Sequence, residues 1–257
     1  MMAKEQKIEE NTIYDEIKSR ADRIDGIVAG YLPKAEGFPR TVCEAMTYSV
    51  EAGGKRLRPM LMEAVFRMFG GDSDVVKPFM AAIEMIHTYS LIHDDLPAMD
   101  NDDFRRGKPT NHKVFGDAMA TLAGDALLNY AFEIMLKESI GKSNPDRRLK
   151  AIYEIARGAG IYGMIGGQVV DIESEDKSIE KEKLDFIHMN KTAAMIVGCM
   201  RAGAIIGDAS EEELEKITKY SENIGLSFQI VDDILDIVGD EEKLGKPIGS
   251  DIENHKS

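Results

Sequence analysis

The chain contains 257 residues, of which 43% are hydrophobic, and its 46 Asp and Glu residues outnumber its 32 Lys and Arg residues to give a formal net charge of −14. This length and apolar content are sufficient to bury a substantial core. The negative charge argues against a broad nucleic-acid-binding surface, because such surfaces need clustered Lys and Arg to replace phosphate counterions.

Several features predict a cytoplasmic protein. The longest apolar stretch, residues 193–207, is interrupted by Arg201 and is shorter than the roughly 20 residues that cross a membrane, so no membrane span is expected. The charged N-terminus lacks the apolar core of a secretory signal. Cys43 and Cys199 lie far apart and outside any C-x-x-C spacing, which indicates reduced thiols rather than a zinc site or a disulfide framework.

Apolar residues recur at helical spacing along nearly the whole chain, without a convincing strict alternation that would indicate a strand. The predicted fold class is therefore all-α. Helices are expected over residues 4–31, 39–52, 60–69, from a cap at Ser73 or Asp74 toward Asp94, and over 114–138, 146–165, 180–207 and 210–238. Residues 104–112 are expected to form a loop and residues 171–182 a surface connection. No linker or fixed repeat interrupts this pattern, which favours a single domain.

An acidic cluster lies within the last of these helices, in the segment FQIVDDILDIV. Asp232 and Asp236 are four residues apart and share one helix face, with Gln229 one turn earlier. Burying these carboxylates among apolar neighbours is costly unless a cation compensates them. Magnesium takes one or two carboxylates and completes its shell with water and substrate phosphate, so the cluster predicts Mg²⁺ and a phosphorylated ligand. The alternative is an exposed helix end.

A second acidic cluster, HDDLPAMDNDD, follows an apolar helix. Ideal helical geometry does not align Asp94 with Asp100, but a distortion at Pro97 can swing the third carboxylate back toward the first two. Arg105 and Arg106 come directly afterwards and can bind phosphate oxygens bidentately. Acids for a metal and arginines for phosphate are therefore adjacent. For the following Asp102 and Asp103, a solvated position is the favoured interpretation.

A basic segment provides the counterpart to the acids. GGKRLRP, residues 53–59, places Lys55, Arg56 and Arg58 behind two glycines that let backbone amides approach an anion. Such a segment suits a diphosphate, although it also fits the start of a surface helix. His87 lies seven residues before Asp94 and on almost the same helix face, where a satisfied core histidine is the alternative.

Five segments in order, GGKRLRP, HTYSLIHDDLPAMDNDDFRRGKPT, NKTAAM, FQIVDDILD and LGKPIGSD, resemble the motifs of the trans-isoprenyl diphosphate synthases, or polyprenyl synthetases, and most of all those of bacterial farnesyl diphosphate synthases. The resemblance spans residues 53–251. It implies an isoprenoid synthase-type helical bundle around a deep central cavity, usually in a homodimer. The family continues with further helices where this sequence ends, so the single domain over residues 1–257 is expected to lack them.

The resemblance also assigns roles to individual residues. Metal ligands for about three Mg²⁺ ions that bridge the allylic diphosphate are Asp94, Asp95, Asp100, Asp232, Asp233 and Asp236. Residues that contact the allylic substrate are Arg105 and the catalytic group of Lys191, Thr192, Gln229 and Lys246. Isopentenyl diphosphate is expected to bind to Lys55, Arg58, His87 and Arg106.

The implied activity is a head-to-tail condensation of isopentenyl diphosphate with dimethylallyl or geranyl diphosphate, with release of pyrophosphate. Tyr89, five residues before Asp94, resembles the bulky residue that limits chain length in bacterial farnesyl synthases. Together with Ser90 it predicts a C15 product. The alternative for Tyr89 is an ordinary core residue whose hydroxyl is bonded elsewhere.

Three other functions stay open at this point. A geranylgeranyl diphosphate synthase would share the same motifs but usually has a smaller residue at the position of Tyr89. A class I terpene cyclase also combines an Asp-rich motif with Mg²⁺, but its second motif is usually of an Asn/Ser/Glu type, unlike the cluster at Asp232. A non-catalytic partner subunit of a heteromeric synthase would not need both acidic clusters and the basic segment.

Overall fold

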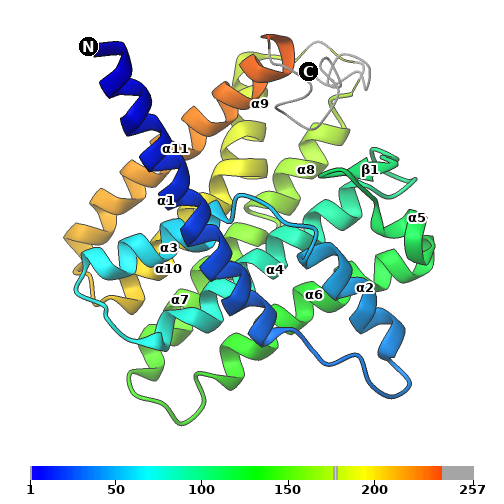
Figure 1. Ribbon diagram of the computed structural model, residues 1–257, viewed down its shortest axis with the longest axis horizontal. Helices are drawn as coiled ribbons and strands as arrows, with labels where there is room; N and C mark the ends of the chain where they lie inside the picture. Colours follow the sequence, from blue (N-terminus) through cyan, green and yellow to red (C-terminus); the bar gives the residue numbers. More distant parts are fainter. Residues whose placement is uncertain (1, 176, 178, 239–257) are drawn as a thin grey trace.

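The computed structural model describes residues 2–175, 177 and 179–238, and for residues 2–11, 232, 233 and 235–238 it describes the backbone only. Within this part of the chain the fold is a bundle of helices, which confirms the predicted all-α class (Figure 1). The longer helices are α1 (Met2–Tyr31), α2 (Arg40–Val50), α3 (Leu57–Met68), α4 (Lys77–Asp94), α6 (Asp117–Lys137), α7 (Pro145–Ala159), α8 (Met164–Ile172), α10 (Ala194–Ile206) and α11 (Glu211–Val238). Shorter elements are the 3₁₀ turn η1 (Asp74–Val76), α5 (Asn111–Phe115), α9 (Lys181–Ile187), the π-helical turn η2 (His188–Ala193), β1 (Phe104–Arg105) and β2 (Lys108–Pro109).

Helix α4 lies at the centre of the bundle, where it packs against α6, α3, α1 and α2 (Figure 1). Its sequence is apolar on most sides, as is typical of a helix that is buried all round. Phe79, Ile83 and Ile86 of α4 are fully buried. A second group of contacts surrounds α10, which packs against α7, α3 and α11. These two groups hold α4 and the α8–α10 segment in fixed positions.

The prediction of one helix over residues 146–165 is wrong in its extent, because the helix is interrupted between α7 and α8. Gly163 causes the break: a Cβ there would lie 2.2 Å from the carbonyl oxygen of Gly158, so the chain passes too close to α7 for a continuous helix of larger residues. Helix α8 then covers Met164–Ile172. Asp171, expected at the start of a surface connection, is instead buried in α8, with 8% of its surface exposed.

The expected helix over residues 180–207 consists of three elements, α9, η2 and α10. The middle one has π-helical hydrogen bonding from His188 to Ala193. A π turn accommodates one additional residue and is frequent at functional positions. It changes which side chains face α8 and α11, both of which contact η2.

Helix α11 begins where the helix over residues 210–238 was expected, and its first turn has a reciprocal cap. The amide of Glu213 donates to Oγ of Ser210 at 3.3 Å, and the amide of Ser210 donates to Oε2 of Glu213 at 2.8 Å. This capping box satisfies amides of the first turn that have no helical partner.

Residues 104–112 do not form a simple loop, because β1 and β2 pair as a short antiparallel hairpin and α5 begins at Asn111. Arg106 and Gly107, between the strands, both have positive φ, at 53° and 75°. Two successive left-handed residues are the geometry of a type I′ turn, which matches the twist of paired strands. Gly116, with φ of 84°, then separates α5 from α6 and so interrupts the helix expected over residues 114–138.

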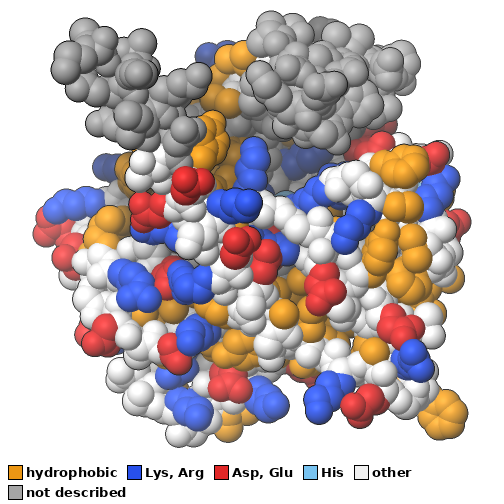
Figure 2. Space-filling view, viewed as in Figure 1, with side chains coloured by type: hydrophobic (Ala, Val, Ile, Leu, Met, Phe, Trp, Pro, Cys, Tyr) orange, Lys and Arg blue, Asp and Glu red, His pale blue; other side chains and the backbone are white. Residues whose placement is uncertain are grey.

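Acidic and basic side chains are interspersed over the face of the molecule shown in Figure 2. Among the described residues, none of the helices is both long enough and apolar enough to cross a membrane. Both cysteines are free thiols; Cys199 is buried and Cys43 is half-buried.

Candidate functional site

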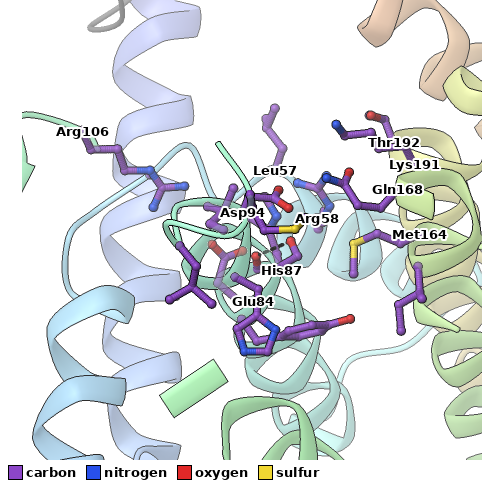
Figure 3. A pocket seen from close by; sticks show the side chains of 18 of the residues that line it. Leu57, Arg58, Glu84, His87, Asp94, Arg106, Met164, Gln168, Lys191 and Thr192 are labelled. Atoms are coloured by element: carbon purple, nitrogen blue, oxygen red, sulfur yellow. Dashed lines mark hydrogen bonds between the residues drawn. The ribbon is translucent and has the colours of Figure 1, made fainter. Parts of the chain in front are cut away.

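A cavity of about 910 Å³ lies between α4 on one side and α8, η2 and α11 on the other. Figure 3 shows Lys191, Thr192, Gln168 and Met164 on one side of this cavity and Arg106 on the other, with Asp94 and Arg58 between them. Its lining includes the sequence-predicted residues Lys55, Arg58, His87, Tyr89, Ser90, Asp94, Arg106, Lys191, Thr192 and Gln229. Residues from five separate segments of the chain therefore meet at one cavity.

Asp94 is the last residue of α4, and the chain turns back directly after it. The amide of Asp100 donates to the carbonyl oxygen of Asp94 at 2.9 Å, and the amide of Asn101 donates to that of Leu96 at 3.1 Å. Asn101 has a left-handed backbone, with φ of 53°. The turn through Pro97 therefore brings the backbone of the third aspartate beside that of the first.

Asp95 lies in a different environment from Asp94. Only 3% of its surface is exposed, and its Oδ1 and Oδ2 accept hydrogen bonds from Nε of Arg105 at 2.7 and 2.9 Å. Burial raises the pKa of Asp95, and the neighbouring guanidinium opposes this shift. Asp95 and Arg105 line a small hollow beside the main cavity and do not line the main cavity itself. Arg106 lines both.

The basic segment at the start of α3 separates into two kinds of cation. Lys55 is exposed at the cavity, and Arg58 is half-buried there, with its Nε lacking a hydrogen-bond partner among the described residues. Arg56 is instead buried, and its guanidinium donates to Asp25, Glu84 and the carbonyl oxygen of Val50, each at 2.6 Å. Arg56 also borders the cavity, so its contact with an anion beside Lys55 and Arg58 stays a prediction, but internal acids already neutralise its guanidinium.

Arg106 and His87 approach the cavity from the hairpin and from α4. Nη1 of Arg106 donates to the carbonyl oxygen of Gly53. A Cβ on Gly54 would lie 2.7 Å from the Arg106 guanidinium, so glycine is needed for this close approach. Burial, and secondarily the guanidinium of Arg58, holds the pKa of His87 well below its ordinary value. His87 is therefore a neutral hydrogen-bonding group at neutral pH.

The opposite wall carries Lys191, Thr192 and Gln168, and Asp171 pairs with Lys191; sequence reasoning missed Gln168 and Asp171. Nζ of Lys191 lies 2.6 Å from Oδ2 of Asp171, and Oγ1 of Thr192 donates to Oε1 of Gln229 at 2.7 Å. Gln168 lines the cavity directly. Sequence could have indicated both residues, because Gln168 and Asp171 are the polar side chains of the otherwise apolar segment MIGGQVVDI and are three residues apart.

A close approach of α8 to η2 fixes the position of the Lys191 backbone. A Cβ on Gly167 would lie 2.2 Å from the backbone nitrogen of Lys191, so only glycine permits the contact. The π turn and Gly167 together set Lys191 and Thr192 over the cavity.

Tyr89 and Ser90 line the cavity from α4, one and a half turns before Asp94. Tyr89 is 5% exposed, and its hydroxyl has no hydrogen-bond partner in the described part of the chain, which differs from the bonded hydroxyl of the core alternative. Burial raises the pKa of Tyr89 to about 12. Oγ of Ser90 donates to the carbonyl oxygen of His87 at 2.9 Å.

Part of the predicted site falls outside this description. The backbone of Asp232, Asp233 and Asp236 belongs to α11, but their side chains lie outside the described atoms, and Lys246 lies outside the described residues. Among the side chains that are described, no three His, Cys, Asp or Glu groups converge in a way that would hold a metal ion by themselves. The roles of these residues stay predictions.

Comparisons with known proteins agree with this geometry. A family model described as polyprenyl synthetase matches residues 39–257. The farnesyl diphosphate synthase of Geobacillus stearothermophilus is 48% identical over 241 residues, which cover 94% of this chain and 81% of that protein. Geranylgeranyl pyrophosphate synthase 3 of Arabidopsis thaliana is 50% identical over 236 residues, which cover 91% and 65%. A crystal structure of geranyltransferase from Helicobacter pylori, complexed with magnesium and isoprenyl diphosphate, superimposes with a TM-score of 0.83 at 32% identity and covers 95% of this chain and 81% of that one.

Proposed function

We propose that this chain, which belongs to the polyprenyl synthetase family, is a prenyltransferase that condenses isopentenyl diphosphate with dimethylallyl or geranyl diphosphate head to tail. The observation that carries the proposal is the cavity of about 910 Å³, which is lined by cations on opposite sides and by apolar residues of α4 and α8. A diphosphate binds to the cations while its apolar tail occupies the interior. Two such ligands fit the two separate sets of cations.

The two sets of cations support two substrates. Lys55 lies just before α3, Arg58 in its first turn and His87 on α4, and with Arg106 they form the proposed site for isopentenyl diphosphate. Lys191 and Thr192 lie across the cavity, and with Arg105, Gln229 and Lys246 they form the proposed allylic site. The neutral His87 then acts as a hydrogen-bond donor rather than as a charge.

Magnesium is the cation we propose for the acidic clusters, with about three ions in the complete site. The residues fit such an ion, because Asp94 lines the cavity and a 2.9 Å hydrogen bond from the backbone amide of Asp100 to the carbonyl oxygen of Asp94 brings the backbones of two members of one motif together. Asp95, Asp232, Asp233 and Asp236 complete the proposed set of hard oxygen ligands. When bound, Mg²⁺ neutralises negative charge on the diphosphate of the substrate.

The residues of this chain support the reaction in two ways. Lys191 and Thr192 stabilise charge on the departing pyrophosphate as the allylic C–O bond breaks. The apolar wall that includes Val169 and Ile172 excludes water from the resulting carbocation. The double bond of isopentenyl diphosphate attacks to form the new C–C bond, and the released pyrophosphate accepts the proton that is lost.

We propose a C15 product, because the Tyr89 ring lies in the wall of the cavity beside Ser90. The alternative is a C20 product, since relatives of similar identity include both farnesyl and geranylgeranyl synthases.

A homodimer located in the cytoplasm is the proposed state of the protein, built on one domain over residues 1–257. Around a surface hollow of about 530 Å³, Phe38 and Leu122 are exposed next to the half-buried Val42 and Met119. A second copy would cover these apolar groups. The two free thiols are compatible with a reducing compartment.

The test is an incubation with labelled isopentenyl diphosphate and, separately, C5, C10 and C15 allylic diphosphates, each with Mg²⁺ and with EDTA. Elongated products that require Mg²⁺ are expected, and their absence would refute the proposed activity. A cyclic product formed from an allylic diphosphate alone would instead indicate a terpene cyclase. Activity that appears only after mixing with a second synthase subunit would indicate a partner role.

A further inference from the structure

Tyr89 rests against a second ring, that of His93. The two rings make an edge-to-face contact, with centroids 5.7 Å apart and planes at 80°. The residues are four apart on α4, so they lie on the same helix face one turn from each other. Both line the cavity. Any movement of the Tyr89 ring on this side is therefore limited by the position of the His93 ring.

Helix α6 holds the His93 ring in place. Nε2 of His93 lies 3.1 Å from the carbonyl oxygen of Thr121, and because a carbonyl only accepts, Nε2 carries the proton and donates it. Asp125 lies further away, with Oδ1 3.9 Å from the same nitrogen. The His93 ring is therefore hydrogen-bonded to α6 through Nε2 and makes an edge-to-face contact with the Tyr89 ring.

Gly124 of α6 makes the space that the His93 ring occupies. A Cβ at this position would lie 2.1 Å from Nε2 of His93 and 2.4 Å from Cδ2. Neither distance is compatible with van der Waals contact, so a side chain at position 124 and the present position of the ring exclude each other. Gly124 is buried in the middle of a helix, where glycine is otherwise unfavourable relative to alanine.

We propose that His93 is a positioning residue for product length, and that Gly124 sets its position. The inference rests on the proposed prenyltransferase activity. A prenyl tail that grows into the cavity meets the Tyr89 ring, and the His93 ring in edge-to-face contact with it limits how far the Tyr89 ring can be displaced. The length of the product thus depends on a contact between α4 and α6 as well as on the size of residue 89.

Two substitutions of opposite size test the proposal. His93→Ala removes the ring that packs against Tyr89, so the Tyr89 ring can move aside and the cavity can take a longer tail. The C20:C15 product ratio is expected to rise by about 10-fold, since apolar pockets discriminate by roughly this factor per methylene. Gly124→Ala moves the His93 ring toward Tyr89 and the cavity, and the C10:C15 ratio is expected to rise instead. In the double variant the added methyl group refills part of the vacated space, and the C20:C15 ratio is expected to fall back toward that of the wild type.

Products are measured as dephosphorylated alcohols at equal, low conversion with saturating isopentenyl diphosphate and Mg²⁺, and urea denaturation checks that each variant is folded. Tyr89→Ala serves as the control for a deepened cavity. If the wild type makes no elongated product, the proposed function fails. If the wild type elongates but the His93 and Gly124 variants keep its product ratios, or both shift them in the same direction, the role of His93 is refuted. Should Gly124→Ala not fold, a double variant with the same C20:C15 ratio as His93→Ala refutes it.

Discussion

Asp95 and Arg105 form a salt bridge in which both carboxylate oxygens are used: Nε of Arg105 lies 2.7 and 2.9 Å from Oδ1 and Oδ2, and Nη2 lies 2.6 Å from Oδ1. The pairing raises the pKa of Arg105, whereas burial outweighs it at Asp95 and raises the pKa of that carboxyl as well. The pair therefore contributes less to the free energy of unfolding than its short distances suggest. Neighbouring aspartates of one motif thus have different surroundings, since Asp94 lines the main cavity and Asp95 holds Arg105.

Asp95→Asn is expected to lower the free energy of unfolding by about 2 kcal/mol in the absence of metal. This is less than the ~3–5 kcal/mol for breaking a fully buried pair, because Arg105 is about a third exposed and keeps some hydration. Asp94→Asn is the matched control and should lower stability by less than Asp95→Asn, since the Asp94 residue is half-buried at the cavity whereas Asp95 is buried. Urea denaturation with EDTA measures both; equal losses would contradict the separate roles.

His87 makes stability depend on pH. Its pKa in the folded protein lies well below the ordinary value of 6.5, so the unfolded chain binds more protons between these two values. Stability is then unaffected by His87 above pH 6.5 and is lost as pH falls below it, by at most about 1.4 kcal/mol per pH unit. His87→Asn removes this titration.

Urea denaturation of wild type and His87→Asn at several values between about pH 5 and 8 measures the difference, while other titrating groups affect both proteins alike. The wild type should lose more stability toward low pH than the variant. Parallel profiles would show that protonated His87 is accommodated beside Arg58 and Arg106.

Periodicity predicted the helices of this fold but not where they break. Gly163 and Gly116 interrupt helices for tertiary or conformational reasons, namely a carbonyl 2.2 Å from a would-be Cβ and a φ of 84°. Neither is visible in a pattern of apolar residues. The π turn at His188–Ala193 is similarly hidden, because one additional residue in a helix changes its register without changing its composition.

The site was predictable where a polar group stands in apolar surroundings, as at Asp94, His87 and Lys191, all of which line the cavity. Local sequence could not separate Arg56 from its neighbours in GGKRLRP. The acids that bind it, Asp25 and Glu84, are 31 and 28 positions away in the chain. Which cation faces inward is decided by packing between helices.

The ring of Tyr89, rather than its hydroxyl, is expected to set both packing and product length. The buried hydroxyl has no partner among the described residues, and an unsatisfied buried polar group costs roughly 1–3 kcal/mol. Tyr89→Phe should therefore raise the free energy of unfolding by about 1 kcal/mol while the main product stays the same. Thermal and urea denaturation with product analysis test this, and a loss of stability would reveal a hydrogen bond to the hydroxyl.

Arg56 is expected to be essential for stability although it contacts no substrate in the proposed reaction. It links α1, the end of α2 and α4 through Asp25, the Val50 carbonyl and Glu84, and its own backbone is left-handed, with φ of 49°. Arg56→Ala leaves Glu84, only 2% exposed, without its partner, which should cost about 3–5 kcal/mol. Replacing both Arg56 and Glu84 by methionine should recover most of this loss, because no buried charge is then left unpaired, and Asp25, which also loses Arg56, is 43% exposed and keeps its hydration.

Arg56→Lys separates charge from geometry at the same position. A lysine ammonium keeps the charge beside Glu84 but cannot match the planar fork with which Arg56 reaches three acceptors, so an intermediate loss of about 1–3 kcal/mol is expected. Because Arg56 stands between Lys55 and Arg58, the KM for isopentenyl diphosphate should rise in the folded lysine variant. The KM for the allylic substrate should change little, since Lys191 and Thr192 lie across the cavity on η2. Equal increases in both KM values would contradict a role confined to the basic segment.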